Sequence, residues 1–531
     1  MSEQQKKQNF LQGTALLAMA TAIVKVIGAL YKIPLKAIIG DQGFGYFNTA
    51  YEIYNVLLMI STAGLPVAMS RMISQASSLR HYNQVRRVYA TARGIFLGLG
   101  IAGTLLMTVF CRQLAAFQNQ PDAWAAIGCL GPCVLLICVM SSFRGYFQGQ
   151  GNMLPTSVSQ VLEAVVKLVV GILAAMALLR ATSSVPLAAG GAILGVTASC
   201  LVSSVFLFSV FRKSYHLLPG SGEEADSFGA TAKGLLIIAV PITLGSAGLQ
   251  LLTMLETKIY MGRLLANGMT QSNADVVRGI YGMTQTIFNM PCAFIPAITI
   301  SIIPAITSQL TLLRYEEARQ TEESAARVTG LIAMPCAIGL AVLAEPITAL
   351  LGLYSGEKLI LATSLMRVLA IAIIFDSVVL VTTAIMQAHG HAVRPVINML
   401  CGGLLKLLAV YILTGNPNIG ILGTPIGTLV CYAMISVLNL ISLRQLIPHT
   451  PAIVRNLIRS FLAACVMGVF CWGVWFGMKH LGISSRLLLC GLPIAAGVLV
   501  YFVAAISMKA ITREDCLLLP KGEKIARLLH L

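Results

Sequence analysis

The chain has 531 residues, of which 57% are hydrophobic and only 11% are charged, and its mean hydropathy is +0.83. Soluble domains carry about 25% charged residues, so this composition excludes an ordinary soluble enzyme. The net charge of +17 does not indicate a nucleic-acid-binding module, because the Lys and Arg residues lie in short loops between apolar runs. The 13 cysteines include no CxxC motif and no Cys/His pair at metal-ligand spacing, which excludes a disulfide framework and a zinc site. The composition predicts an all-α polytopic membrane protein.

A helix needs about 20 mostly apolar residues to cross the hydrocarbon core of a bilayer, and this rule predicts about fourteen spans. The predicted spans are 14–38, 45–70, 92–112, 124–143, 156–179, 187–211, 233–256, 279–303, 327–351, 360–387, 396–414, 420–443, 457–478 and 486–508. The polar segment MSEQQKKQNF precedes the first span without a cleavage site. We therefore expect an uncleaved first helix and not a signal peptide.

The orientation follows from the distribution of basic residues. An even number of spans puts both termini on one side of the membrane, and 23 of the 37 Lys and Arg residues fall on that side. Five more lie within spans, and the opposite side holds Lys36, Arg112, Arg180, Lys258, Arg263, Arg278, Lys358, Lys479 and Arg486. Because cytoplasmic loops are enriched in Lys and Arg, the bias predicts that both termini are cytoplasmic.

Two alignments of the chain with itself indicate an internal repeat. A shift of 239 residues aligns Gln148, Gly151 and Lys167 with Gln387, Gly390 and Lys406. A shift of 234 residues aligns Gly45, Ile53, Asn55, Ser74 and Gln75 with Gly279, Ile287, Asn289, Ser308 and Gln309. Two parallel six-helix repeats would give a lobe at 1–213, a cytoplasmic linker at 214–231, a second lobe at 232–446, and helices 13 and 14 with a basic tail at 447–531. Transporters built in this way usually bind substrate between their halves.

Charged side chains inside a span are costly and normally face a cavity or a partner. Lys25, Lys32 and Lys36 lie at i, i+7 and i+11, so they form one stripe along the first span. A substrate that carries phosphate groups would need such a stripe. The alternative is that Lys36 and Lys32 reach outward to the lipid headgroups. We expect Lys25, which lies too deep for that, to bind the phosphates.

A second polar stripe is predicted on span 45–70. Asn48, Glu52 and Asn55 lie at i, i+4 and i+7 and so share one face of the helix. Asn289 is the counterpart of Asn55 in the repeat. Such a stripe either lines a cavity or joins neighbouring helices by hydrogen bonds, and Glu52 is also a candidate partner for Lys25.

Further charged residues lie within the later spans. Glu163 and Lys167 are at i and i+4, the favoured order for an ion pair, so they either pair with each other or meet the substrate. Lys406 has no acid four residues before it, which makes it the more exposed candidate for substrate. Glu256 and Asp376 are candidates to bind a coupling Na⁺ or proton.

No cofactor motif is present in the sequence. His389 and His391 have HxH spacing in AHGHAVRP, but this segment is a predicted cytoplasmic loop without further ligands, so we expect both side chains to be solvated. Apart from a coupling Na⁺ or proton, or the membrane potential, the sequence predicts no cofactor and no metal.

Three segments carry a resemblance to a known family. They are GYFNTAYEIYN (45–55), GLPVAMSRMIS (64–74) and RGYFQGQGNMLPTSVSQVLEAVVK (144–167), and they resemble the stage V sporulation protein B group. This group belongs to the oligosaccharide flippases of the multidrug/oligosaccharidyl-lipid/polysaccharide exporter superfamily and is related to the lipid II flippases. The resemblance implies a V-shaped fourteen-helix fold in the cytoplasmic membrane. It also implies a flippase that moves an undecaprenyl-(pyro)phosphate-linked cell-wall sugar, lipid II or a similar lipid-linked oligosaccharide, by alternating access.

The resemblance also implies a binding site. In the related lipid II flippases, basic residues of helices 1, 2 and 8 line the cavity and meet the pyrophosphate, and helices 13 and 14 form a groove for the lipid tail. Here Lys25 and Lys32 lie in helix 1 and Arg278 lies at the outer start of helix 8, whereas NVLLM in helix 2 offers no basic residue. The implied partners are the lipid-linked oligosaccharide, the lipid bilayer and cell-wall synthesis enzymes, with no nucleic acid.

Two other classes of function compete with this interpretation. A cation-coupled multidrug antiporter of the same superfamily would have about twelve helices and an acidic cavity, whereas this chain has fourteen predicted spans and a lysine-bearing first helix. A membrane glycosyltransferase or sugar polymerase would need a pair of catalytic acids in an early outer loop. The first outer loop, GDQGFGYF, offers Asp41 alone, so we expect a transporter and not an enzyme.

Overall fold

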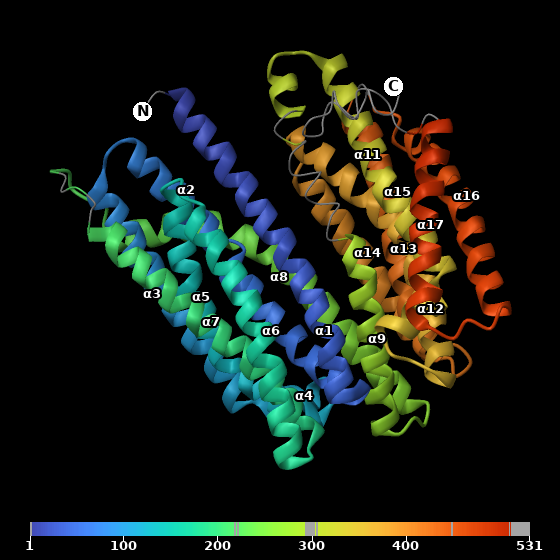
Figure 1. Cartoon of the computed structure of the whole chain (residues 1–531). Helices are drawn as coiled ribbons and strands as arrows, with labels where there is room; N and C mark the ends of the chain where they lie inside the picture. The colour runs from blue at the N-terminus through green and yellow to red at the C-terminus, as the bar shows by residue number, and fades with distance from the viewer. Residues whose placement is uncertain are drawn as a thin grey trace. The chain divides into compact units, whose positions relative to one another are not determined.

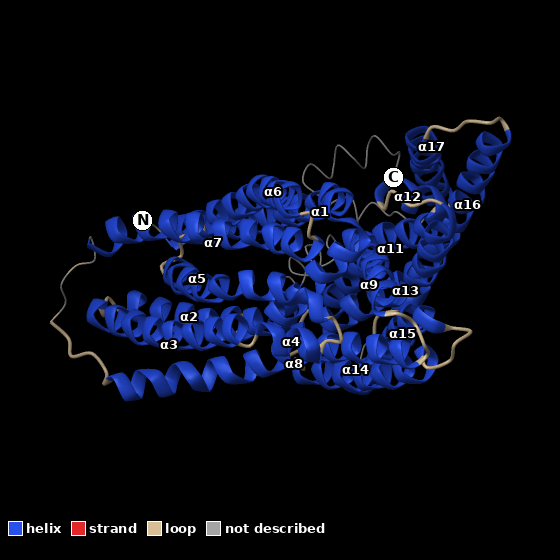
Figure 2. Ribbon diagram, turned by 90° about the horizontal axis from the view of Figure 1, so that it is seen from below, coloured by secondary structure: helices blue, strands red, loops and turns tan. Residues whose placement is uncertain are grey.

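The computed structural model describes residues 3–216, 219, 222–292, 303, 306–447, 450–508 and 510. In the first helix it describes the side chains of 20, 23, 24, 27 and 28 and of all residues from 30 onward. Every regular element in these ranges is a helix, and loops or turns join the helices (Figure 2). The all-α prediction is therefore confirmed for the described part of the chain.

The chain forms two compact units, residues 1–279 and 280–531 (Figure 1). The first unit contains α1 (Glu3–Thr62), α2 (Leu65–Ser78), α3 (Tyr82–Val109), α4 (Cys111–Phe117), the short 3₁₀ helix η1 (Pro121–Ala123), α5 (Trp124–Gly149), α6 (Leu154–Thr182), α7 (Val185–His216) and α8 (Phe228–Ala266). The boundary falls within α9 (Gln271–Cys292). The second unit contains α11 (Tyr315–Val342), α12 (Ala344–Leu351), α13 (Gly356–Ala388), α14 (Val393–Thr414), η2 (Gly420–Leu422), α15 (Gly423–Leu446), α16 (Ile453–His480) and α17 (Arg486–Ser507).

The first two predicted spans are joined in one kinked helix. α1 continues through the predicted loop between them, and Gly40 at the kink has a φ of 70°, a conformation that glycine adopts without steric cost. The predicted second span, 45–70, also differs at its end, because α1 stops at Thr62 and α2 starts at Leu65. Pro66 lies in the first turn of α2, where a missing backbone N–H breaks no helical hydrogen bond.

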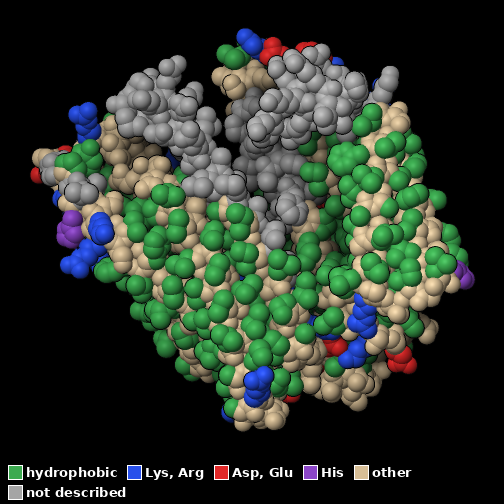
Figure 3. Space-filling model, in the orientation of Figure 1, with side chains coloured by type: hydrophobic (Ala, Val, Ile, Leu, Met, Phe, Trp, Pro, Cys, Tyr) green, Lys and Arg blue, Asp and Glu red, His purple; other side chains and the backbone are tan. Residues whose placement is uncertain are grey.

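Twelve helical segments among the described residues are long and apolar enough to cross a membrane. The first, 30–78, includes the end of the first predicted span and all of the second. The predicted span 279–303 extends into residues 293–302, which lie outside the described residues, so the count of fourteen stays a prediction. Hydrophobic side chains are spread over the middle of the visible face, and charged side chains gather toward the ends of the helices (Figure 3). This is the surface of a multi-pass membrane protein.

Within each unit, the helices pack side by side. In the first unit, α1 packs against α5, α6, α7 and α8, and α8 also packs against α2. In the second unit, α11 packs against α13 and α16, and α16 packs against α17. The lobe boundaries predicted from the repeat, 1–213 and 232–446, stay a prediction.

Candidate functional site

Two basic side chains lie near Lys32 inside the first unit. Lys32 on α1 lies close enough to Lys167 on α6 and Arg278 on α9 for both positive charges to act on it. Arg278 is 1% exposed, and the two lysines are half-buried. Because like charges repel and each is costly inside a membrane, this arrangement favours an anion among the three groups.

Arg278 is held by an acid on another helix. Its guanidinium forms an ion pair with Glu52 of α1, and it lies 5.7 Å from the ring centroid of Tyr260 on α8. Glu52 therefore neutralises Arg278, although the sequence made it a candidate partner for Lys25. The side chain of Lys25 lies outside the described residues, so its predicted role stays a prediction.

The third lysine of the predicted stripe has a different role. Lys36 Nζ lies 3.2 Å from Asp41 Oδ1, and both side chains are buried. Lys36 therefore pairs within α1 across the kink and does not extend outward toward headgroups. Lys32, the middle lysine of the predicted stripe, is the one that lies near Lys167 and Arg278.

The asparagines of the predicted polar stripe and its repeat counterpart differ in their contacts and in their exposure. Asn48 Nδ2 donates a hydrogen bond to the carbonyl oxygen of Phe44 at 2.9 Å, which is a local contact within the helix. Asn55 is half-buried, and Asn289, in the second unit, is exposed. Cavity lining by these three residues stays a prediction.

Of the two alternatives for Glu163, the pair with Lys167 along α6 is not formed. Glu163 Oε2 lies 3.1 Å from Arg144 Nη2 on α5, and Arg144 Nε also donates to Ser159 Oγ at 3.1 Å. The carboxylate thus joins α6 to α5 instead of turning along its own helix to Lys167. This leaves Lys167 with the cations near Lys32.

The candidates for ion coupling lie in both units. Glu256 on α8 is 2% exposed, and its charge acts on Glu52. Asp376 on α13 is 8% exposed and lies near the Cys292 thiol. Lys406 is half-buried on α14. Across the described ranges, no group of three or more His, Cys, Asp and Glu residues is placed to hold a metal ion.

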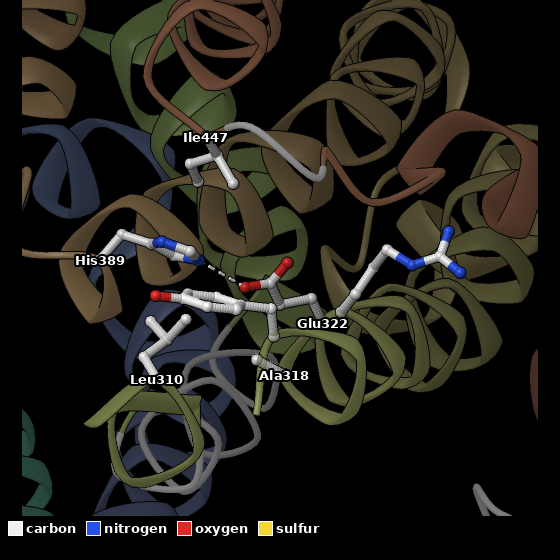
Figure 4. A pocket seen from close by; sticks show the side chains of 7 residues that line it. Leu310, Ala318, Glu322, His389 and Ile447 are labelled. Atoms are coloured by element: carbon white, nitrogen blue, oxygen red, sulfur yellow. Dashed lines mark hydrogen bonds and ion pairs between the residues drawn. The ribbon is translucent and has the colours of Figure 1, made fainter. Parts of the chain in front are cut away.

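A pocket in the second unit corrects the expectation for His389. Its Nε2 lies 2.7 Å from Glu322 Oε1, and their side chains are 16% and 2% exposed. The two point toward each other beside a cavity of about 190 Å³ that Leu310, Ala318 and Ile447 also line (Figure 4). His389 therefore joins the end of α13 to α11 and is not solvated. The hydrophobic surroundings could not be read from AHGHAVRP alone.

An apolar groove runs along the last two helices. A cavity of about 440 Å³ is lined by Val466 of α16 together with residues at the end of α17 and just after it, which are Leu499, Val500, Val503, Ala504, Ser507 and Met508. The neighbouring side chains of Val469 and Trp472 are 72% and 51% exposed. Such a surface suits an acyl or isoprenoid chain.

A polar network at the start of α9 was missed from the sequence. Tyr46, Gln120 and Asp275 are each 0–1% exposed, and Tyr46 and Gln120 each donate a hydrogen bond to Asp275. They come from three parts of the first unit that are up to 229 residues apart. No local spacing signals such a cluster.

Comparisons with known proteins place the chain in a family. The model of the family described as "Polysaccharide biosynthesis protein" matches residues 10–310. Three relatives come from Bacillus subtilis (strain 168). "Stage V sporulation protein B" is 23% identical over 522 residues, which cover 97% of this chain and 98% of that protein. "Uncharacterized membrane protein YabM" is 26% identical over 443 residues, 83% of this chain and 81% of that protein. "Lipid II flippase MurJ" is 23% identical over 416 residues, which cover 75% of this chain and 76% of that protein.

Solved structures share the fold. The inward closed conformation of lipid II flippase MurJ matches with a TM-score of 0.70 and 12% identity, over 92% of this chain and 98% of that one. The inward-facing conformation of a multidrug resistance MATE family transporter matches with a TM-score of 0.65 and 15% identity, over 81% of this chain and 97% of that one. The chain belongs to the Polysaccharide biosynthesis protein family of the multidrug/oligosaccharidyl-lipid/polysaccharide exporter superfamily, and it is a membrane transporter and not an enzyme.

Proposed function

We propose that the chain is a flippase that moves an undecaprenyl-(pyro)phosphate-linked cell-wall sugar, lipid II or a similar lipid-linked oligosaccharide, across the cytoplasmic membrane by alternating access. The observation that carries the proposal is the approach of Lys32 to Lys167 and Arg278 within one unit. A pyrophosphate group offers several acceptor oxygens to such cations. It would also relieve the repulsion between the two ammonium groups.

Two further observations support a lipid-linked anion. The apolar groove of α16 and α17 provides a surface for a long lipid tail outside the cationic site. The names of two relatives refer to sporulation and to lipid II flipping. A substrate with a polar phosphate head and an isoprenoid tail combines both kinds of surface.

The proposal includes an architecture and an orientation. We assign fourteen helices, two six-helix repeats that enclose a V-shaped cavity, and two additional helices at the C-terminal end. Both termini and the linker around Gly222 are assigned to the cytoplasm because of the basic-residue bias. A cysteine at Gly222 should resist membrane-impermeant thiol reagents in intact cells, and labelling there would reverse the orientation.

Reconstitution into liposomes with lipid II tests the function. Lys32→Gln and Lys167→Gln each remove a charge-assisted contact of about 1.5–3 kcal/mol, which corresponds to a loss of transport of about 10- to 100-fold. Lys213→Gln, at an exposed position on α7, is the matched control and should transport as the unaltered protein does. Normal transport by Lys32→Gln and Lys167→Gln would overturn the proposed site.

Lys25 is tested in the same assay. Lys25→Arg should keep much of the activity, because Arg also binds phosphate and often does so bidentately. Lys25→Gln should insert into the membrane but should not bind the phosphate groups of the substrate. Normal transport by Lys25→Gln would remove Lys25 from the site and leave Lys32, Lys167 and Arg278 as its cations.

A cation-coupled multidrug antiporter is the second candidate, favoured by the burial of Glu256 and Asp376 and by the shared fold. The same liposomes decide between the two. An antiporter would move a cationic drug against a Na⁺ or proton gradient and leave lipid II in place. In that case Glu256→Gln or Asp376→Asn, and not Lys32→Gln, would abolish transport.

A further inference from the structure

A buried carboxyl group lies one turn before Arg278 on α9. Asp275 is 1% exposed. Its Oδ1 accepts hydrogen bonds from Gln120 Nε2 at 2.8 Å and Gln271 Nε2 at 3.0 Å, and its Oδ2 lies 3.1 Å from the Tyr46 hydroxyl. All three contacts come from neutral groups, so none of them balances a negative charge.

The Tyr46 hydroxyl lies between two carboxyl groups. Besides Asp275 it faces Asp122 Oδ2 at 3.3 Å, and it accepts a hydrogen bond from Gln42 Nε2 at 2.8 Å. A phenol has one hydrogen and two acceptor lone pairs, so it can donate to one of the two carboxylates only. The other oxygen–oxygen contact needs a hydrogen of its own. One proton on either carboxyl group supplies it and fills the second lone pair of the hydroxyl.

Three cations on the helices around this group contact other side chains. Lys36 pairs with Asp41 on α1, Arg278 pairs with Glu52, and Lys258 of α8 lies 3.5 Å from the ring centroid of Phe117. Burial and the negative charge of Asp122 therefore raise the pKa of the Asp275 carboxyl above its ordinary value, against the amide hydrogen bonds that lower it. Asp275 lies outside the predicted span 279–303.

Asp122 connects this group to the solvent. Its residue is exposed, whereas Tyr46 and Asp275 are buried. A proton that arrives on Asp122 can pass inward in one exchange. The Tyr46 oxygen takes that proton as the phenol hydrogen moves to Asp275 Oδ2, so one O–H bond breaks and one forms at each step and the hydroxyl is restored.

We propose that Asp122, Tyr46 and Asp275 form a proton site through which transport responds to the pH on one side of the membrane. The proposal rests on the proposed function, whose orientation puts the site on the outer side. The site and the substrate cations share two helices, because Tyr46 and Glu52 lie on α1 and Asp275 and Arg278 on α9. Loss of the proton leaves two negative charges around one hydroxyl. Their repulsion pushes the start of α9 away from η1, weakens the hydrogen bond between Asp275 and Tyr46 of α1, and so displaces Arg278.

Infrared spectroscopy of the full chain in lipid vesicles tests the proton directly. The difference spectrum between the unaltered protein and Asp275→Asn should contain the carbonyl band of a protonated, buried carboxyl group near neutral pH, because other buried carboxyl groups such as Glu256 and Asp376 contribute equally to both proteins and cancel. Asp226→Asn, at an exposed linker position, is the matched control and should keep the band. Should Asp275→Asn fail to fold, Asp122→Asn answers the same question, because the Tyr46 hydrogen can then go to an ionised Asp275. The absence of this band from the difference spectra of both substitutions would overturn the proposal.

Transport measured against pH on the Asp122 side tests the coupling. The rate of the unaltered protein should change several-fold across the titration, and the rate of Asp275→Asn should stay constant. The coupling would be overturned if the transport rates of the unaltered protein and of Asp275→Asn changed with pH in the same way. If the liposomes move no lipid-linked sugar, the proposed function fails, whereas the infrared band still decides whether the pair holds a proton.

Discussion

Gly45 of α1 and Gly279 of α9 lie against each other. A β-carbon on Gly45 would come within 3.4 Å of the backbone nitrogen of Gly279 and 2.8 Å of the carbonyl oxygen of Asp275. A β-carbon on Gly279 would come within 1.8 Å of the carbonyl oxygen of Asp41. These two glycines are the pair that the internal repeat aligns. Their lack of side chains lets the two backbones touch, and this contact brings Arg278 to Glu52.

Gly279→Ala should therefore separate the two helices. The new methyl group would meet a backbone oxygen that cannot move aside, and overpacking of this kind costs about 1–3 kcal/mol. We expect a lower unfolding temperature in detergent and a loss of transport. Gly248→Ala on α8, where a β-carbon meets nothing within 4 Å, is the control and should leave both unchanged. Equal stability of the two variants would contradict the close contact.

The ion pair beside these glycines can be dissected by a double substitution. Arg278→Gln leaves the Glu52 carboxylate half-buried without its partner, and breaking a buried pair costs about 3–5 kcal/mol. Arg278→Gln/Glu52→Gln should recover most of the stability, because both charges are then absent. It should not recover transport if Arg278 also meets the phosphate.

The measurement combines thermal unfolding with the lipid II assay. Recovery of both stability and transport in the double variant would show that Arg278 serves the fold alone. Arg278→Lys adds a control for charge, since Lys keeps the positive charge without the planar fork of Arg.

Hydropathy predicted the helices well because each span is a local property of about 20 residues. The partner with which a charged side chain pairs, in contrast, is not a local property of the sequence. The i, i+4 spacing favoured Glu163 with Lys167, yet Glu163 reaches α5 and pairs with Arg144. Spacing cannot weigh a contact within a helix against one between helices, since the second depends on how the helices pack.

The same reason explains what the sequence could not show about the candidate site. Lys32 and Arg278 were both candidates, but their approach depends on α1 and α9, which are far apart in the chain. The Glu52 partner of Arg278 lies 226 residues away. The kink at Gly40 was likewise predicted as a loop, because a Gly-rich polar segment between two apolar runs is typical of a turn.

The His389 contact offers a test in the second unit. His389→Ala removes the partner of a carboxylate that is 2% exposed, and a lost hydrogen bond to a buried charged group costs about 1.5–3 kcal/mol. We expect a lower unfolding temperature. His391→Ala is the matched control, because His391 donates its backbone N–H to the Met386 carbonyl oxygen, a contact that the substitution keeps. Equal effects of the two substitutions would contradict a structural role for the His389–Glu322 contact.

The stability of the unaltered protein should fall as the pH rises through the titration of Asp275. The pKa of this carboxyl is raised in the folded protein, whereas in the unfolded chain it takes the ordinary Asp value of about 3.9. Between the two values the folded protein holds a proton that the unfolded chain has lost, so the free energy of unfolding decreases with increasing pH and levels off above the folded pKa. Asp275→Asn has no proton to lose. The free energy of unfolding of Asp275→Asn minus that of the unaltered protein should therefore increase with pH. The contributions of all other titratable groups are the same in both proteins and cancel in this difference. Asp226→Asn should give a difference that does not vary over the same range. A constant difference for Asp275→Asn would mean that the buried carboxyl is ionised throughout.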